Sequence, residues 1–334
     1  MPQRRSLMGW QIAALSAAGA VGSLALANWL ARVGLREPET ALSGAEALYP
    51  WTEGTVRYMV RGRGEPMLLL HDLLPGSSAY DFRAVFAPLA ERYRVFAPDL
   101  LGYGLSGRPA TQYTPRLYAT LVEDLLRQVI GATDQPAHVI AAGQSAQFAV
   151  LAAATRPQLF RSLTLIEPVG LVEPTPNEPR AMASQLARLL LRTPLVGESA
   201  YNAVVSRAGL RRALRLRFAA GSAGAARVSD DVVDQYYTLA HQPGARFAPA
   251  DALAAAYSPE AREAVEAFAA LDAPVLLVWG QRDPARPVAE ASALREAHPA
   301  AQLRVFPTGG MPQIEAPDAF TQEVFAWLRA AAHV

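Results

Sequence analysis

The segment from residue 143 to residue 147 reads Gly-Gln-Ser-Ala-Gln and approaches the Gly-x-Ser-x-Gly pattern that carries a serine nucleophile. A serine hydroxyl attacks a carbonyl only with the help of a nearby base, commonly histidine, and of an acid that orients this base. Asp283 follows an apolar run and could be such an acid, and the chain holds five histidines. These residue types raise nucleophilic hydrolysis by Ser145 as a first hypothesis.

Two residue types are absent from the 334-residue chain, and their absence excludes other chemistries. The chain has no cysteine, and all 31 basic residues are arginine. Thiolate nucleophiles, disulfides and sulfur-ligated metal sites are therefore excluded, as are Schiff-base enzymes and P-loop ATPases, which need a lysine. The formal net charge of +1 gives no reason to expect nucleic acid as a partner. We expect no metal, no cofactor, and a small molecule as ligand or substrate.

The elements that must position these residues follow from the apolar pattern after residue 54. Short apolar runs predict strands, and the later runs are continuously apolar, as in a parallel sheet buried on both faces. Helical patterns lie between them, which predicts one doubly wound α/β unit. The predicted strands are residues 56–60, 67–71, 93–97, 139–142, 163–166, 275–279 and 303–306, and the predicted helices are 84–91, 115–130, 146–154, 289–298 and 319–332.

Residues 171–260 interrupt this alternation with helical runs and no strong strand. We therefore expect a helical cap, inserted between two parts of the core at residues 55–170 and 261–334. The first half of the cap is basic, and Arg207, Arg211 and Arg215 share a helix face at spacings of four. This face is either solvated or in contact with anionic lipid headgroups.

The N-terminal part, residues 1–32, contains an uncharged run from residue 6 to residue 31. About 20 apolar residues span a bilayer. The run is either a membrane anchor, with the globular part outside the cytoplasm, or a signal peptide cleaved near residues 25–27, which would leave a secreted protein. A core helix of a soluble protein is a third interpretation. Residues 33–54 show no clear period and predict a tether.

Four segments together resemble the α/β-hydrolase superfamily, in the capped branch that includes esterases, haloperoxidases and C–C hydrolases. Residues 68–72 stand where this family has a strand ending in His-Gly, and residues 99–106 match its D-x-x-G-x-G-x-S loop. Residues 278–283 match the strand that ends in the triad acid, and residues 309–317 match G-H-x-P-x-x-E-x-P. The resemblance covers residues 55–330 and implies an α/β-hydrolase fold with a mostly parallel sheet and a helical cap, here preceded by the hydrophobic N-terminal helix.

The same resemblance implies that Asp283 is the triad acid, although an aspartate before Pro284 can also simply cap a turn. The base should be the second residue of the G-H-x-P motif, and that residue is Gly310, with flanks that align without a gap. Glycine cannot accept a proton. His241, in the cap, is the histidine that could reach in as a substitute. Glu167 is a possible alternative acid, but a structural carboxylate explains it better.

The nucleophile position falls on Gly143 or on Ser145. In a tight strand–turn–helix elbow, the residues two before and two after the nucleophile approach each other and must be small. They are Ala141 and Ser145 if Gly143 is the apex, but they include the large Gln147 if Ser145 is. The family's spacing to the next proline, here Pro157, also favours Gly143. A glycine tolerates the positive φ of the elbow but has no oxygen with which to attack.

The oxyanion loop departs from the family as well. The resemblance implies that the backbone N–H groups of Leu73 and Gln144 bind the oxyanion, and that His71 is structural. The glycine expected after His71 is Asp72. A carboxylate at this place opposes developing negative charge unless it points away or is paired.

These departures lead to three hypotheses. The first is a membrane-anchored hydrolase-fold protein that has lost the Ser-His machinery and binds a small apolar, ester- or lipid-like ligand between core and cap. The second is an active serine esterase that uses Ser145 and Asp283 with a non-standard base. The third is an acid-based enzyme in which Asp72 and Asp283 act as a carboxylate pair. The sequence does not indicate an oligomeric state.

Overall fold

The computed structural model describes residues 21–35, 38, 42–172, 178–219 and 228–331. Eight strands form one sheet in the order β1-β2-β4-β3-β5-β6-β7-β8. β1 pairs with β2 and β2 with β4 in antiparallel fashion, and all other neighbours are parallel. The strands are β1 (Ala45–Trp51), β2 (Gly54–Arg61), β3 (Pro66–Leu70), β4 (Arg94–Pro98), β5 (Ala137–Ala142), β6 (Phe160–Ile166), β7 (Val275–Gly280) and β8 (Gln302–Phe306).

Helices cover both faces of the sheet, because alternate residues of its central strands are apolar on opposite sides. Leu68 and Leu70 of β3 pack into one buried cluster, and Met67 and Leu69 pack into another. The mostly parallel, doubly wound sheet predicted from the sequence is confirmed. The helices of the core are α2 (Phe86–Leu89), α3 (Pro115–Asp124), α4 (Ser145–Thr155), α11 (Pro259–Ala269), α12 (Val288–Ala297), α13 (Pro312–Glu315) and α14 (Pro317–Ala331), with short 3-10 turns at Ala79–Phe82 and Pro157–Leu159 and a π turn at Leu125–Ile130.

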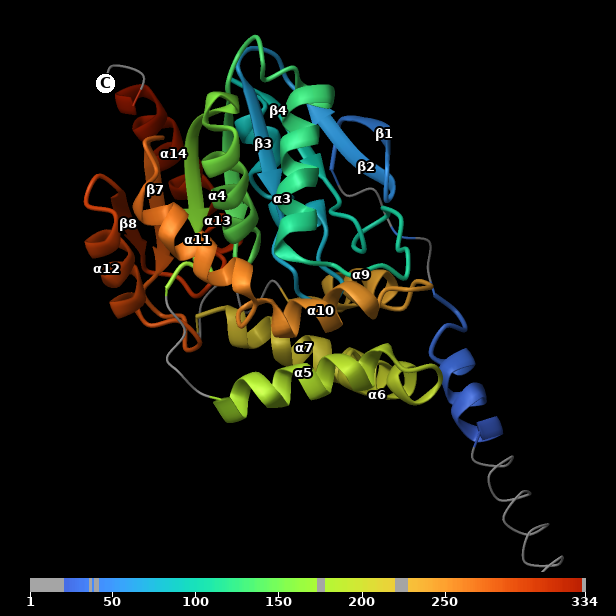
Figure 1. The fold of residues 1–334 in the computed structure, drawn as a ribbon. Coiled ribbons are helices and arrows are strands. Elements are labelled where there is room, and N and C mark those ends of the chain that lie inside the picture. Colours follow the sequence, from blue (N-terminus) through green and yellow to red (C-terminus); the bar gives the residue numbers. More distant parts are fainter. Residues whose placement is uncertain (1–20, 36–37, 39–41, 173–177, 220–227, 332–334) are drawn as a thin grey trace, which may run out of the picture.

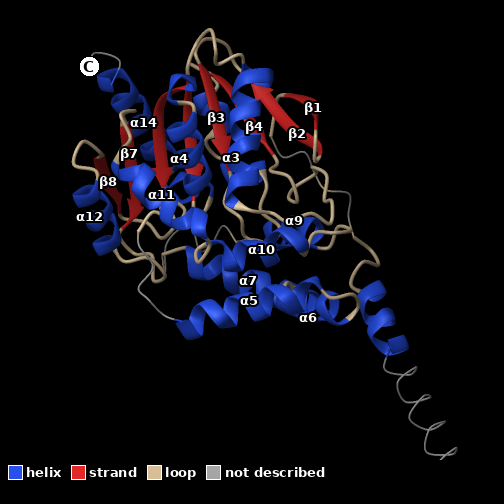
Figure 2. Ribbon diagram, in the orientation of Figure 1, coloured by secondary structure: helices blue, strands red, loops and turns tan. Residues whose placement is uncertain are grey.

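In its described residues, the insertion between β6 and β7 contains helices and no strand, and it faces the ends of the central strands (Figure 2). The carboxyl end of β3 points toward it (Figure 1). Side-chain groups that follow parallel strands therefore meet the cap at one edge of the sheet. The helices of this cap are α5 (Glu178–Arg192), α6 (Val196–Val204), α7 (Arg207–Arg217), α9 (Asp230–Ala240) and α10 (Phe247–Ala255).

Two sequence expectations need correction. The tether expected over residues 33–54 is only partly without regular structure, because Ala45–Trp51 form β1 and pair with β2 along their whole length. β1 is an edge strand whose residues are mostly exposed, so its sequence lacks the apolar pattern from which a strand is predicted. The single helix expected over residues 115–130 ends as α3 at Asp124, and Leu125–Ile130 follow as a π turn.

A helix over residues 21–30 lies against α6. Asn28 donates to the carbonyl of Leu195 at 3.2 Å and accepts from Ser199 at 3.0 Å and Asn202 at 3.1 Å. Within the part of the chain that is described, no helix combines the length and apolarity needed to cross a bilayer. Residues 1–20 of the expected anchor lie outside the described residues.

Candidate functional site

Gly143 stands at the turn between β5 and α4, with a φ of 57°. Such a positive φ is strained for a residue with a side chain but not for glycine. A β-carbon at Gly143 would overlap the carboxyl group of Asp72. The space directly above this turn is therefore filled by Asp72, which comes from the loop after β3.

Ser145 is the first residue of α4, two positions after the turn, and it is fully buried. Its hydroxyl donates to the backbone carbonyl of His71. The group that the sequence offered as a nucleophile thus ties α4 to the loop after β3. The described residues bring no histidine or carboxylate side chain into a hydrogen bond with this hydroxyl.

Asp72 accepts both N–H groups that the family resemblance assigns to oxyanion binding. Its Oδ1 lies 2.8 Å from the nitrogen of Leu73 and 2.9 Å from that of Gln144. Its Oδ2 lies 3.8 Å from the guanidinium nitrogens of both Arg217 and Arg286. The carboxylate is thus bonded to the two N–H groups that the resemblance assigns to an oxyanion, and it is paired with two cations, which is one of the exceptions that the sequence left open.

His71 holds this loop in position. Its Nδ1 donates to the carbonyl of Asp72 at 2.6 Å, and the nitrogen of Leu100 donates to its Nε2 at 2.9 Å. Both ring nitrogens are engaged with the backbone, which sets the tautomer with the proton on Nδ1. His71 is thus a structural residue beside the site.

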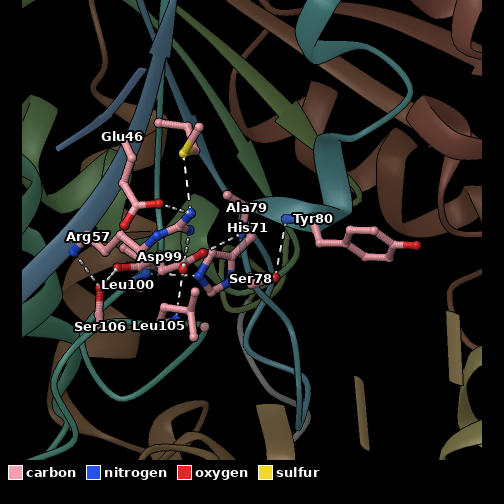
Figure 3. A network of polar contacts seen from close by, with 12 residues as sticks. Glu46, Arg57, His71, Ser78, Ala79, Tyr80, Asp99, Leu100, Leu105 and Ser106 are labelled. Carbon is pink, nitrogen blue, oxygen red and sulfur yellow. Dashed lines mark hydrogen bonds and ion pairs between the residues drawn. The ribbon is translucent and has the colours of Figure 1, made fainter. Parts of the chain in front are cut away.

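The D-x-x-G-x-G-x-S loop is built around the buried carboxylate of Asp99 (Figure 3). Asp99 accepts from the nitrogens of Ala79 and Leu105, both at 2.8 Å, and pairs with Arg57 at 3.2 Å. A β-carbon at Gly104 would overlap the Asp99 side chain, which is why the loop needs a glycine there. The carboxylate of this motif therefore binds backbone N–H groups and does not act as an acid in the site.

Asp283, after β7, is buried, and its Oδ1 accepts from the nitrogen of Ala285 at 2.7 Å. Gly310 faces it: a β-carbon at Gly310 would overlap Asp283 Oδ2 and lie 2.7 Å from Glu167 Oε2 and 3.1 Å from Arg217 Nε. The space of the expected base is thus taken by two carboxyl groups and a guanidinium.

Glu167, after β6, has a φ of 43° and is fully buried. Its Oε1 accepts from the nitrogen of Gly280 at 3.0 Å, and its Oε2 lies 3.7 Å from Arg217 and 3.9 Å from Arg286. Burial and the nearby Asp283 carboxyl raise the pKa of Glu167 to about 8, against the opposing effect of the arginines. A proton on Glu167 would allow it to donate to Asp283, and Glu167 Oε2 and Asp283 Oδ2 are two buried oxygens that otherwise have no hydrogen-bond partner.

The two arginines come from opposite sides of the site. Arg217 is the last residue of α7 in the cap; it donates to the carbonyl of Gly310 at 3.0 Å, and its own carbonyl accepts from the Gly310 nitrogen at 2.6 Å. Arg286 precedes α12 and donates to the carbonyl of Glu167. Burial and the charge of Arg217 lower the pKa of Arg286 from its ordinary value.

These five side chains form what we call the charge cluster: Asp72, Glu167, Asp283, Arg217 and Arg286. With Glu167 protonated, its two carboxylates balance its two guanidinium groups, which is the condition for holding charges in a buried place. Asp72 pairs with the arginines and Asp283 with Glu167, so the two aspartates do not pair with each other. No group of three or more potential ligands in the described part of the chain is placed to hold a metal ion.

The remaining histidines lie elsewhere. His241, at the end of α9, donates from Nδ1 to the carbonyl of Tyr237 at 2.8 Å and stacks on the ring of that tyrosine, with ring centroids 3.9 Å apart. His138 lies 2.7 Å from Ser162 at the other end of the sheet, and His298 packs against Phe268. His333 is outside the described residues.

Sequence reasoning missed three members of the charge cluster in their present role. Glu167 follows a buried strand at the carboxyl edge of the sheet, and this was the one available signal. Arg217 belongs to a run of cap arginines that looks like a solvated helix face. Arg286 lies in a loop that no motif covers. Only the packing of the cap on the sheet brings them together.

The model of the alpha/beta hydrolase family matches residues 67–323. An uncharacterized protein of Mycobacterium tuberculosis is 27% identical over 268 residues, which cover 76% of this chain and 72% of the relative. The 2-hydroxymuconate semialdehyde hydrolase of Pseudomonas putida is 28% identical over 280 residues, covering 81% of this chain and 89% of that enzyme.

A solved structure shares the fold over nearly the whole chain. It is described as a membrane phospholipase A and a bacterial virulence factor, and it aligns with a TM-score of 0.65 at 23% identity. The alignment covers 99% of this chain and 100% of that structure.

Proposed function

Since this chain belongs to the alpha/beta hydrolase family, we propose that it keeps the family's fold as a binding protein and has lost Ser-His-Asp hydrolysis. In this proposal Gly143 occupies the nucleophile position and Gly310 the base position, and Asp283 is what remains of the triad. Loss of the nucleophile and the base costs several orders of magnitude in rate.

One observation carries the proposal: the Asp72 carboxylate accepts the N–H groups of both Leu73 and Gln144. Hydrolysis of an ester needs such donors free for the oxyanion of the tetrahedral intermediate. Here they are already bonded to a negative charge of the protein itself. A substrate carbonyl that entered this place would meet a carboxylate instead of two free donors.

The ligand we propose is small and apolar, of ester or lipid type, bound between core and cap. A similarity in structure supports the lipid type, because a protein of the same fold is described as a phospholipase A. A similar protein named a hydrolase of 2-hydroxymuconate semialdehyde supports only a small-molecule ligand.

We further propose that residues 1–32 hold the protein at a membrane, with its globular part outside the cytoplasm. The uncharged run over residues 6–31 supports this. The alignment of 99% of the chain with a membrane phospholipase A supports it as well. A secreted protein, released after cleavage near residues 25–27, remains the alternative.

The test uses a fluorophosphonate probe, which labels activated serines, on the full chain in isolated membranes. We expect no labelling, and hydrolysis of short p-nitrophenyl esters at the background rate both in the wild type and in Ser145→Ala. An active serine hydrolase added to the same membranes controls for the probe. Labelling or turnover that disappears in Ser145→Ala would establish the esterase hypothesis and refute ours.

Binding is measured separately. Quenching of tryptophan fluorescence by p-nitrophenyl butyrate should saturate without release of nitrophenol. A linear, non-saturating response would contradict the binding part of the proposal while leaving the loss of hydrolysis untouched.

A further inference from the structure

Helix α5 turns its charged side inward and its apolar side outward. On the inner side, Arg188 Nε and Arg192 Nη1 each lie 2.7 Å from one oxygen of Asp251, which belongs to α10 and is 5% exposed. Arg192 also donates to the carbonyl of Thr111 in the core at 2.9 Å. The amphipathic helices of soluble proteins do the reverse, with the apolar stripe on the core and the charges in water.

The outer side of α5 carries four large apolar residues, which we call the cap apolar face. They follow one another at helical spacings of four, three and one, so they form one stripe. Single exposed apolar residues are common on protein surfaces, but a stripe of four on one helix indicates a surface that something else covers. The face consists of Met182 (65% exposed), Leu186 (61%), Leu189 (59%) and Leu190 (47%).

The helices α5, α6 and α7 of the cap are basic. From residue 178 to residue 217 the chain carries eight arginines and two acids, Glu178 and Glu198. On α7, Arg207 and Arg211 are paired with aspartates of α9, whereas Arg212 and Arg215 are exposed. A cap that carries both an exposed apolar stripe and exposed arginines suits the boundary between the headgroups and acyl chains of a leaflet with anionic lipids.

The N-terminal run enters the molecule at this same side. Its described end, the helix over residues 21–30, contacts α6 through Asn28 and carries exposed Leu26, Trp29 and Leu30. In Figure 1 this helix, α5 and α6 lie on the side of the cap that is remote from the sheet. An anchor that continues from this helix brings the bilayer to the cap rather than to the opposite end of the sheet.

We propose that the cap apolar face lies in the headgroup boundary of the bilayer to which the protein is anchored, with anionic phospholipid as its occupant. This inference rests on the membrane part of the proposed function and is independent of the loss of hydrolysis. It fixes the orientation of the molecule: α5 lies along the membrane, and the charge cluster sits on the opposite side of the cap, at the sheet.

The absence of cysteine from the chain permits a direct test on the full protein. A single cysteine at Leu186→Cys carries an environment-sensitive nitrobenzoxadiazole label. The matched control is Leu48→Cys on the edge strand β1, because Leu48 is 62% exposed and Leu186 is 61% exposed. Each labelled protein is reconstituted into vesicles of phosphatidylcholine and phosphatidylglycerol, with nitroxide groups on the acyl chains as quenchers.

We expect blue-shifted emission and several-fold stronger nitroxide quenching at position 186 than at position 48. Leu190→Cys is the second position on the face and should behave like position 186, which guards against a single variant that fails to fold. Equal, water-like emission at positions 186, 190 and 48 would overturn the inference. So would shielding at position 186 that resists lipid quenching and increases with protein concentration, because it would indicate a second copy of the chain.

Flotation of the vesicles separates this inference from its premise. A protein that does not float with the vesicles refutes the anchor and this inference together. A protein that floats with a water-exposed position 186 refutes the inference alone. Neither result changes the outcome of the fluorophosphonate test.

Discussion

The Asp72 carboxyl group fills the space that a side chain at position 143 would need. The glycine leaves out a side chain at the turn after β5, and the aspartate, coming from the loop after β3, fills the place and bonds to the two surrounding N–H groups. A side chain at position 143 is therefore incompatible with the present position of Asp72. Their effects on stability should therefore be coupled.

We expect Gly143→Ala to destabilise the wild type by about 1–3 kcal/mol from overpacking against Asp72, in addition to the strain of a positive φ. In an Asp72→Gly background the overpacking disappears, so the same substitution should cost less, by about 1 kcal/mol or more. Chemical denaturation of the four proteins measures this coupling. Gly131→Ala is the control, because Gly131 has a φ of 77° but open space around it. Equal costs in both backgrounds would show that Asp72 does not fill this space.

The second prediction at this scale concerns the proton on Glu167. Its pKa is about 8 in the folded protein and near its ordinary value of 4.5 in the unfolded chain. Between these values the folded state binds a proton that the unfolded state has released, so the free energy of unfolding falls as the pH rises, by up to about 1.4 kcal/mol per pH unit. Above pH 8 this contribution levels off.

Glu167→Gln copies the protonated carboxyl group and cannot release its proton. The variant should therefore gain stability relative to the wild type as the pH rises from 4.5 to 8, as measured by denaturation at a series of pH values. Glu91→Gln, at an exposed position, leaves the charge cluster untouched and serves as control. A difference between wild type and Glu167→Gln that stays constant over this pH range would rule out the raised pKa.

Helix α5 illustrates what happens at the scale of elements. It is held by the ion pairs of Arg188 and Arg192 with Asp251 and by Leu191, which packs against a buried apolar cluster. Asp251 also accepts from the nitrogen of Tyr113 at 2.9 Å, so one carboxylate connects α5, α10 and the loop before α3. The cap contacts the core through this group and through two hydrogen bonds between Arg217 and Gly310, one from the backbone and one from the guanidinium group.

Asp251→Ala removes the shared partner of two arginines. Because both arginines are about a quarter exposed, water compensates part of the loss, and we expect a cost of about 1–2 kcal/mol. Amide hydrogens of α5 should then exchange about tenfold faster, while those of the central strands change little. Asp234→Ala, which breaks the more exposed pair with Arg207, should alter the exchange of α5 far less. Unchanged exchange in α5 after Asp251→Ala would mean that other contacts hold this helix.

At the scale of the whole molecule, the charge cluster, the cap and the N-terminal helix follow one another outward from the sheet. The carboxyl edge of the sheet presents Asp72, Glu167 and Asp283, the cap covers this edge, and the N-terminal helix lies against the outer part of the cap. A membrane on the outer side of α5 would place the charge cluster at a set height above the lipid. The comparison of labels at positions 186 and 48 is a prediction about this arrangement, since no single element determines which side of the molecule meets the bilayer.

The sequence predicted the fold more completely than it predicted the site. The central strands were predicted within a few residues because continuous apolar runs are needed wherever both faces of a sheet are buried. The exposed edge strand β1 has no such pattern and was missed. The segments around Asp283 and Gly310 were recognised from local motifs, and their roles in the site remain predictions.

The sequence alone determined the class of the fold and the absence of histidine from the motif at Gly310, because both are properties of local patterns and residue types. Only the tertiary structure decided where the Asp72 carboxylate points and what replaces the missing base. Asp72, Gln144, Arg217 and Arg286 belong to four separate segments, and their contacts depend on the packing of loops and cap at one edge of the sheet. The balance of buried positive and negative charges depends on that packing, so it cannot be predicted from any single segment of the chain.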